Sequence, residues 1–145
     1  MIVADTNLVA YLLTPGERTD AAEAVRARDS EWVAPPLWRS EFGSVLVQHL
    51  RAGSLDQATA LAAWEDAEAL FSGREQAAAA ASILDVALRH TLSAYDAEFV
   101  ALAEELGVPL VTDDRRVLKA CPDVAVSIDD FARDRDAPGA DVPDR

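Results

Sequence analysis

The sequence predicts an α/β fold with a parallel sheet, and three features support this prediction. Short apolar segments typical of buried strands are separated by longer segments with helical periodicity. Parallel strands need crossover connections, and the intervening helices provide them. Half of the 145 residues are hydrophobic, which is enough for one sizeable core. We therefore expect one folded domain over residues 1–132, followed by a polar tail over 133–145 that is predicted to be disordered.

The first half of the chain is predicted to be mostly helical after an initial strand. Residues 2–4 are apolar and precede Asp5 and Thr6, so a buried strand is expected to lead directly into a helix that stops before Pro15. The later elements expected in this half are a helix over 18–28, a strand over 32–34, a helix over 36–52 with Gly53 as its stop, and a helix capped by Ser54 that ends near Phe71.

The second half is predicted to return to the sheet after two more helices. The alanine-rich segment 75–89 favours one helix, and Ser93 and Gly107 mark the start and the end of the next. Three short elements are expected after it: a strand over 108–111, one or two helical turns over 115–120, and a strand over 124–128.

The composition restricts the location and the partners. No signal peptide and no apolar run of transmembrane length is visible, and the single cysteine, Cys121, excludes an internal disulfide. These features predict a soluble, cytoplasmic protein. The formal net charge of −13 disfavours strong binding of nucleic acid, because phosphate groups usually bind to basic surfaces. A nucleic-acid partner would depend on divalent cations, which offset carboxylate charge, or on a basic protein.

Three carboxylates stand out by their position relative to the predicted elements. Asp5 and Asp114 follow predicted strands, and binding sites in parallel sheets form beyond the carboxyl ends of the strands. Glu41 lies one helical turn from both Leu37 and Val45. A carboxylate in such an apolar stripe is costly unless it is paired or binds a metal, which makes Glu41 a candidate ligand.

Asp96 is the fourth candidate, because it lies in the first turn of a helix and can point toward a neighbouring strand end. It borders a stripe that the helical spacing places on the core face, namely Tyr95, Phe99, Leu102 and Leu106. Clusters of carboxylates suit hard cations such as Mg²⁺ or Mn²⁺. A zinc site is excluded, because one cysteine and two isolated histidines cannot build it.

Each of these carboxylates also has a purely structural explanation. Asp5 can cap the first helix, Asp96 fits a capping box, and Glu41 can pair with a surface cation. Asp113 and Asp114 point to opposite sides of an extended strand, so one of them can cap the next helix while the other faces a site. We expect Asp114 to face the site.

Around these residues the chain resembles PIN-domain nucleases, and within them the VapC-type toxins. The likeness extends over residues 2 to about 131 and lies in four motifs: Met1–Asn7, Ser40–Phe42, Ser93–Ala103 and Leu110–Arg116. The resemblance implies a three-layer α/β/α domain with a mostly parallel sheet of about five strands wrapped by helices. It further implies a metal-dependent endoribonuclease that hydrolyses RNA phosphodiester bonds and acts as the toxin of a toxin–antitoxin pair.

The resemblance also implies roles for particular residues and partners. The family's four acidic positions fall on Asp5, Glu41, Asp96 and Asp114. They are expected to be catalytic and to hold one or two Mg²⁺ ions, with Mn²⁺ as the alternative. The residues expected to orient a ligand or bind the substrate are Asn7, Thr112 and Arg115. The implied partners are an RNA substrate, a cognate antitoxin protein and a second copy of the chain in a homodimer, with no membrane.

Two other classes of protein with an Asp after the first strand fit less well. A haloacid-dehalogenase-like phosphatase needs a second Asp where this chain has Asn7, and a downstream Lys, whereas the only Lys is Lys119. A receiver domain is disfavoured by the helical stretch 36–89, which shows no clear strand. A Mg²⁺-binding regulatory module, PIN-like or receiver-like and without nuclease activity, stays open as the alternative function.

Overall fold

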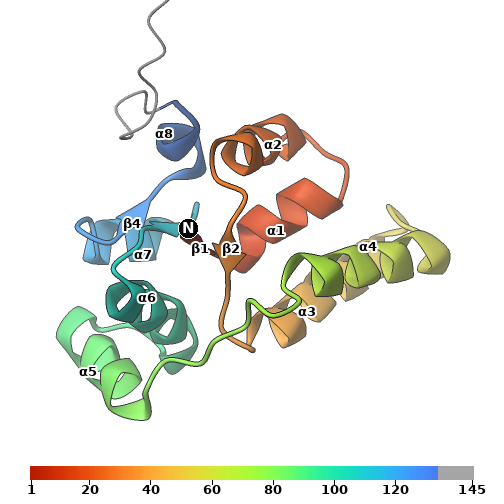
Figure 1. Cartoon of the computed structure of the whole chain (residues 1–145). Coiled ribbons are helices and arrows are strands. Elements are labelled where there is room, and N and C mark those ends of the chain that lie inside the picture. Colours follow the sequence, from red (N-terminus) through yellow and green to blue (C-terminus); the bar gives the residue numbers. More distant parts are fainter. Residues whose placement is uncertain (134–145) are drawn as a thin grey trace, which may run out of the picture.

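Four short parallel strands form the sheet at the centre of the molecule (Figure 1). The computed structural model describes residues 1–133. The spatial order of the strands is β2 (Trp32–Val33), β1 (Ile2–Ala4), β3 (Leu110–Val111) and β4 (Ala125–Val126). Val3 of β1 is in register with Val33 on one side and Leu110 on the other. Because all the strands are parallel, their carboxyl ends meet at one edge of the sheet.

The expected count of about five strands is one too high for the described residues. The position beside β2 is taken by a single parallel bridge between Ala34 and Glu75. Two backbone hydrogen bonds accompany this bridge: the Ala34 N–H donates to the Arg74 carbonyl at 3.3 Å, and the Gln76 N–H donates to the Ala34 carbonyl at 3.1 Å. The alanines at 77–79 are poor strand formers, so the pairing does not extend beyond a bridge.

Helices cover both faces of the sheet. Those in the described residues are α1 (Thr6–Leu13), α2 (Thr19–Arg28), α3 (Trp38–Ala52), α4 (Gln57–Leu70), α5 (Ala80–His90), α6 (Ala94–Leu106), α7 (Arg115–Ala120) and α8 (Ile128–Arg133). Side chains alternate between the two faces of each strand. Ile2 and Val111 therefore pack with α1–α4 and α8, whereas Val3 and Leu110 pack with α5–α7. This is the expected three-layer α/β/α arrangement.

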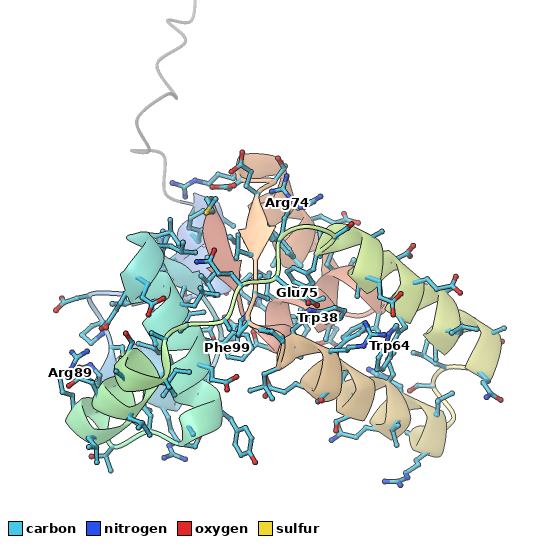
Figure 2. The ribbon with its side chains drawn as sticks, turned by 60° about the horizontal axis from the view of Figure 1, so that its bottom comes forward. Trp38, Trp64, Arg74, Glu75, Arg89 and Phe99 are labelled. Carbon is cyan, nitrogen blue, oxygen red and sulfur yellow. The ribbon has the colours of Figure 1, made fainter. Side chains whose placement is uncertain are left out.

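The alanine-rich helix, α5, begins five residues later than its composition predicted. Residues 76–79 are not helical, and Glu75 forms the bridge beside β2. The carboxylate of Glu75 also accepts a hydrogen bond from the indole Nε1–H of Trp38 at 2.6 Å (Figure 2). Trp38 is buried, and a buried indole N–H needs a partner. These contacts between distant residues outweigh the helix propensity of the local sequence.

Two further boundaries differ from the prediction, and the others agree to within two residues. α4 begins at Gln57 and is capped by Asp56 rather than by Ser54, because the Asp56 carboxylate accepts a backbone N–H of the first turn at 2.7 Å. The last strand ends two residues earlier than expected, because Ile128 begins α8. The Ile128 N–H donates to Asp113 at 3.1 Å, a contact made across the fold.

Only Arg133 of the predicted tail, 133–145, is among the described residues, and it is the last residue of α8. The rest of that prediction lies outside them. In the part of the chain that the structure describes, no helix has both the length and the apolar character needed to cross a membrane.

Candidate active site

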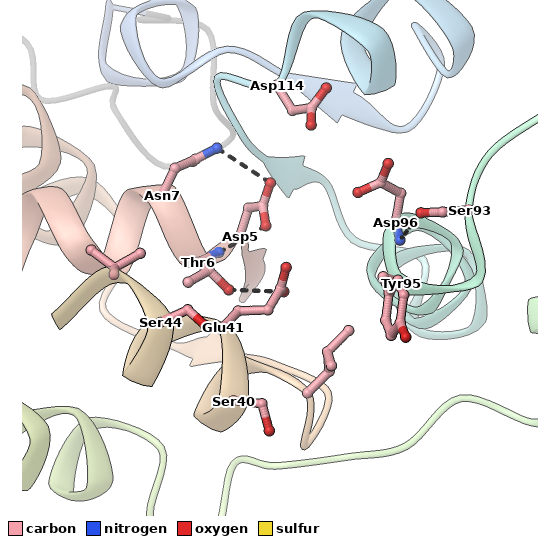
Figure 3. A pocket seen from close by; sticks show the side chains of 12 residues that line it. Asp5, Thr6, Asn7, Ser40, Glu41, Ser44, Ser93, Tyr95, Asp96 and Asp114 are labelled. Carbon is pink, nitrogen blue, oxygen red and sulfur yellow. Dashed lines mark hydrogen bonds between the residues drawn. The ribbon is translucent and has the colours of Figure 1, made fainter. Parts of the chain in front are cut away.

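Asp5 is the first residue after β1, and its carboxylate makes two kinds of contact. Oδ1 accepts the Thr6 N–H at 2.8 Å, which caps α1, and Oδ2 accepts the hydroxyl of Thr112 at 2.5 Å. The side-chain amide of Asn7 also donates to Oδ2, at 3.4 Å (Figure 3). Asp5 therefore caps a helix and at the same time lines a pocket beyond the sheet edge, so the two explanations weighed from the sequence do not compete.

Thr112 is fully buried after β3 and connects the ends of the two central strands. Its Oγ1 donates to Asp5 and accepts the backbone N–H of Asp114 at 3.0 Å. The amide of Asn7 donates to the same oxygen at 3.4 Å. One buried hydroxyl thus holds the carboxylate of Asp5 and the backbone of Asp114 in a fixed relation.

Asp114 faces the pocket, as expected, but the expected division of tasks with Asp113 is wrong. Asp114 also caps α7, accepting the N–H groups of Arg116 at 2.9 Å and Val117 at 3.2 Å. Asp113 is directed away and binds the Arg18 guanidinium at 2.8 Å. The strand alternation placed the two side chains on opposite sides correctly. The alternation could not show that Arg18, the residue before α2, lies beside Asp113 in the fold.

Glu41 enters the pocket from α3. Its Oε1 accepts the hydroxyl of Thr6 at 3.1 Å, which ties the first turn of α3 to the first residue of α1. Leu37 and Val45, one turn to either side of Glu41, also line the pocket. The stripe predicted from their spacing is therefore real, and it borders the pocket rather than lying wholly in the core.

Asp96 enters from the opposite side, on the first turn of α6 (Figure 3). The hydroxyl of Ser93 accepts its backbone N–H at 3.1 Å, so the capping motif expected from the sequence is present. The prediction that Tyr95 faces the core is wrong, because 66% of this residue is exposed. The reason is that the first turn of α6 borders the open pocket, whereas Phe99 and Leu102, further along, are buried.

The four expected carboxylates thus come from four different parts of the chain and line one open pocket of about 630 Å³. The residues that line it are Asp5, Thr6, Asn7, Leu37, Ser40, Glu41, Ser44, Val45, Ser93, Tyr95, Asp96 and Asp114. None of them is a cation. Arg115, expected to contact the substrate, is exposed and outside this lining. The charge of the neighbouring Arg116 partly offsets the burial and repulsion that raise the pKa of Asp96.

Burial and mutual repulsion shift the acidity of three of these carboxylates. Burial is the main cause that raises the pKa of Asp5 to about 6, and the charges of Asp114 and Asp96 add to it. Burial and the charge of Asp5 raise the pKa of Glu41 to about 7. Burial and the charge of Asp114 raise the pKa of Asp96 as well. The pocket therefore disfavours the ionised forms of these three carboxylates.

The donor chemistry of this pocket fits a hard divalent cation. All its charged donors are carboxylate oxygens, and a cation would offset the repulsion that adds to the effect of burial on the pKa of Asp5. Among residues 1–133, no group of three or more His, Cys, Asp or Glu side chains is arranged to hold a metal ion. Mg²⁺ needs no such cage, because it commonly binds through one or two carboxylates and keeps several waters. The open pocket leaves space for those waters.

Several pocket residues were not found from the sequence. Thr6, Ser40 and Ser44 are small hydroxyl residues beside the predicted ligands. Ser40 and Ser44 have a helical spacing that puts them next to Glu41, so a polar stripe around a candidate ligand is the signal that could have identified them. Thr6 was considered only as a helix cap. Its contact with Glu41 spans 35 residues and follows from the tertiary structure.

Comparisons with known proteins agree with this fold. The model of the PIN domain family matches residues 2–122. The chain is 32% identical over 124 residues to Ribonuclease VapC3 of Pyrobaculum aerophilum, an alignment that covers 83% of this chain and 95% of that protein. The crystal structure of PAE2754 from Pyrobaculum aerophilum has the same fold, with a TM-score of 0.70 at 21% identity, and the match covers 90% of this chain and 85% of that chain.

Proposed function

The chain belongs to the PIN-domain family, and from this premise we propose that it is a metal-dependent endoribonuclease that acts as the toxin of a toxin–antitoxin pair. One observation carries the proposal: carboxylates from four separate elements face a single open pocket at the carboxyl edge of the sheet. The similarity to a protein named as a VapC ribonuclease supports RNA as the substrate.

The proposed metal, Mg²⁺ or Mn²⁺, would be held by the pocket carboxylates. Asp5 and Asp114, whose positions Thr112 fixes, are the proposed direct ligands. Glu41 and Asp96 face them from two helices and would bind a second ion or hold ordered water. When bound, such a cation supplies Lewis-acid chemistry, which lowers the pKa of water toward neutrality and offsets the charge of the phosphate.

The proposed reaction is hydrolysis of an RNA phosphodiester bond. A water oxygen forms the new bond to phosphorus, the bond from phosphorus to the leaving ribose oxygen breaks, and that oxygen ends with a proton. The chain's own contribution is orientation. Thr112 and Asn7 hold Asp5, and Thr6 holds Oε1 of Glu41, so the carboxylates are positioned before the substrate arrives.

A basic antitoxin segment and a homodimer belong to the same proposal. The pocket has four carboxylates and no lining cation, so a Lys or Arg side chain from a partner would find complementary charge there. Such a segment would inhibit by occupying the metal and substrate site. Co-expression with the product of the neighbouring gene should therefore remove growth inhibition. The proposed location of the protein is the cytoplasm.

The test compares wild type with Asp5→Asn, which keeps a good helix cap but removes the charge. Purified wild type should release discrete fragments from total RNA in Mg²⁺ or Mn²⁺ and none in EDTA, and Asp5→Asn should lose at least ~100-fold in rate. Asp66→Asn, the same change at an exposed position of α4, serves as the matched control and should cleave like wild type.

Induced expression in cells completes this test. Growth arrest by wild type and Asp66→Asn, but not by Asp5→Asn, is the expected pattern. Equal arrest by wild type and Asp5→Asn, with intact RNA, would instead favour a regulatory module that acts by binding. No cleavage by the wild type with either metal would reject the nuclease proposal.

A further inference from the structure

Tyr95 is a pocket residue whose position packing does not explain. It precedes Asp96 on the first turn of α6, and its side chain lies at the pocket beside the carboxylates (Figure 3). The residue is 66% exposed. Every other aromatic side chain in residues 1–133 is buried or packs against one of the two hydrophobic cores. Within the same residues, the hydroxyl of Tyr95 has no hydrogen-bond partner.

The charge of the pocket explains why an aromatic surface is useful there. The chain has a net charge of −13, and no Lys, Arg or His lines the pocket. Phosphate contacts from cationic side chains, which usually supply most of the affinity for nucleic acid, are therefore not available from the residues that line the pocket. A substrate must gain affinity there from bound metal or from contacts that do not depend on charge. Base stacking on an aromatic ring is such a contact.

We propose that Tyr95 is a stacking platform for the base next to the bond that is cut, and so a substrate-binding residue of the pocket. This inference rests on the proposed nuclease function and adds a substrate-binding residue to it. A base inside a duplex is covered on both faces by its neighbours, whereas a base in a loop or single strand can lie on an aromatic side chain. Because Tyr95 adjoins Asp96 in the chain, a base on its ring brings the attached phosphate close to the carboxylates.

A contact with another protein is the competing use of an exposed aromatic residue. Two other large apolar side chains, Leu84 and Leu88 of α5, are exposed at 62% and 84% and do not line the pocket. They form a surface that protein partners can cover without entering the site. Tyr95 differs from them because it lies in the pocket lining, which favours a ligand that reaches the carboxylates.

The test measures kcat and KM for cleavage of a random-sequence single-stranded RNA pool in Mg²⁺. Tyr95→Ala should raise KM by roughly 5- to 150-fold with little change in kcat, because stacking in the ground state is lost. Tyr95→Phe and Tyr95→Trp keep an aromatic face and should stay near wild type. Leu88→Ala, the matched control, removes an exposed apolar side chain outside the pocket and should leave both constants unchanged.

Two further readouts separate stacking from other roles. The KM ratio of Tyr95→Ala to wild type should be the same at about 50 mM and about 200 mM salt, because stacking carries no charge. The molar mass of Tyr95→Ala in solution should equal that of wild type. Three results would overturn the inference: an unchanged KM in Tyr95→Ala, an equal rise in KM in Tyr95→Phe, or a change in the molar mass of Tyr95→Ala without a change in its KM.

Failure of the nuclease proposal itself is distinguishable from failure of the stacking inference. If wild type cleaves no RNA, binding of the labelled single-stranded pool is measured directly by fluorescence anisotropy. Weaker binding by Tyr95→Ala than by Tyr95→Phe would then support stacking in a protein that is not a nuclease. Equal binding by the two variants would reject stacking as well.

Discussion

At the scale of single residues, Asp5 shows how one carboxylate serves both the fold and the site. It caps α1 through Oδ1, and through Oδ2 it accepts the hydroxyl of the buried Thr112. Its pKa is raised to about 6, mainly by burial, so the ionised carboxylate at neutral pH is poorly solvated. The functional position of this carboxylate therefore costs stability in the absence of a cation.

The pH dependence of stability follows from this shift. In the unfolded chain Asp5 ionises near the ordinary aspartate pKa of 3.8, but in the folded chain it does so near 6. The folded state binds more protons between these values, so stability falls as the pH rises through them. A shift of about two pKa units corresponds to ~3 kcal/mol. Glu41, with a pKa of about 7, extends the loss toward neutral pH.

We expect urea unfolding in EDTA to show this loss for wild type between about pH 4 and about pH 7. Asp5→Asn cannot ionise, so its stability relative to wild type should increase over the same interval. Asp66→Asn, at an exposed site, serves as the reference for how the free energy of unfolding changes with pH. Parallel curves for wild type and Asp5→Asn would show that the burial of this carboxylate does not act on stability.

At the scale of elements, the packing of α4 against α3 depends on the absence of a side chain at Gly43. A Cβ at this position would lie 2.7 and 2.8 Å from two ring carbons of Trp64. Trp64 is held in place by its Nε1–H, which donates to Glu68 at 2.8 Å, and by its ring contact with Phe42. Because α3 also carries Glu41, this close approach helps to set the position of a pocket carboxylate.

Gly43→Ala should therefore destabilise the protein, although alanine is the better helix former by about 1 kcal/mol. The expected net loss is about 1–3 kcal/mol in the free energy of unfolding, since the bulky indole must move. Gly16→Ala adds a Cβ to open space and should change stability by less than ~0.5 kcal/mol. In a Trp64→Phe background the cost of Gly43→Ala should shrink, and an undiminished cost would reject the steric explanation.

At the scale of the whole molecule, the parallel sheet gathers residues that are distant in the chain. Asp5 and Asp114 are neighbours because β1 and β3 are paired, and Glu41 and Asp96 join them from helices in different layers. Outside the pocket lining, Arg18 binds both Asp113 and Asp129 and so connects the start of α2 with the loop before α7 and with α8. The acidic pocket is therefore built on a scaffold held by contacts between distant segments.

A divalent cation should stabilise this whole arrangement. Mg²⁺ at about 100 times its Kd is expected to raise the melting temperature by roughly 5–10 °C, because it binds the folded state alone. NaCl at matched ionic strength gives the contribution of general screening of the −13 charge, which must be subtracted. The excess effect of Mg²⁺ should disappear in Asp5→Asn and persist in Asp66→Asn. Identical shifts in Mg²⁺ and NaCl would argue against a metal site.

Local patterns were sufficient for most of the fold. The apolar run 2–4, the capping serine at Ser93 and the stop at Gly107 identify elements that lie where they were expected, because such signals act within one or two helical turns. The same patterns selected Asp5, Glu41, Asp96 and Asp114 before their proximity was known. The proximity of Asp5 and Asp114 was predictable because the strands of a parallel sheet end at one edge, whereas Glu41 and Asp96 reach the pocket from helices.

From the sequence, then, local patterns predicted the α/β class with its parallel sheet, the order of the elements and the four carboxylates that line the pocket, and the resemblance to PIN-domain nucleases added the three layers. The tertiary structure alone decided that residues 76–79 do not join α5, that Asp113 binds Arg18, and that Tyr95 lies open in the pocket. The physical reason is that periodicity and capping depend on neighbours along the chain. Each of the three exceptions depends on what packs beside the residue, which only the folded chain brings together.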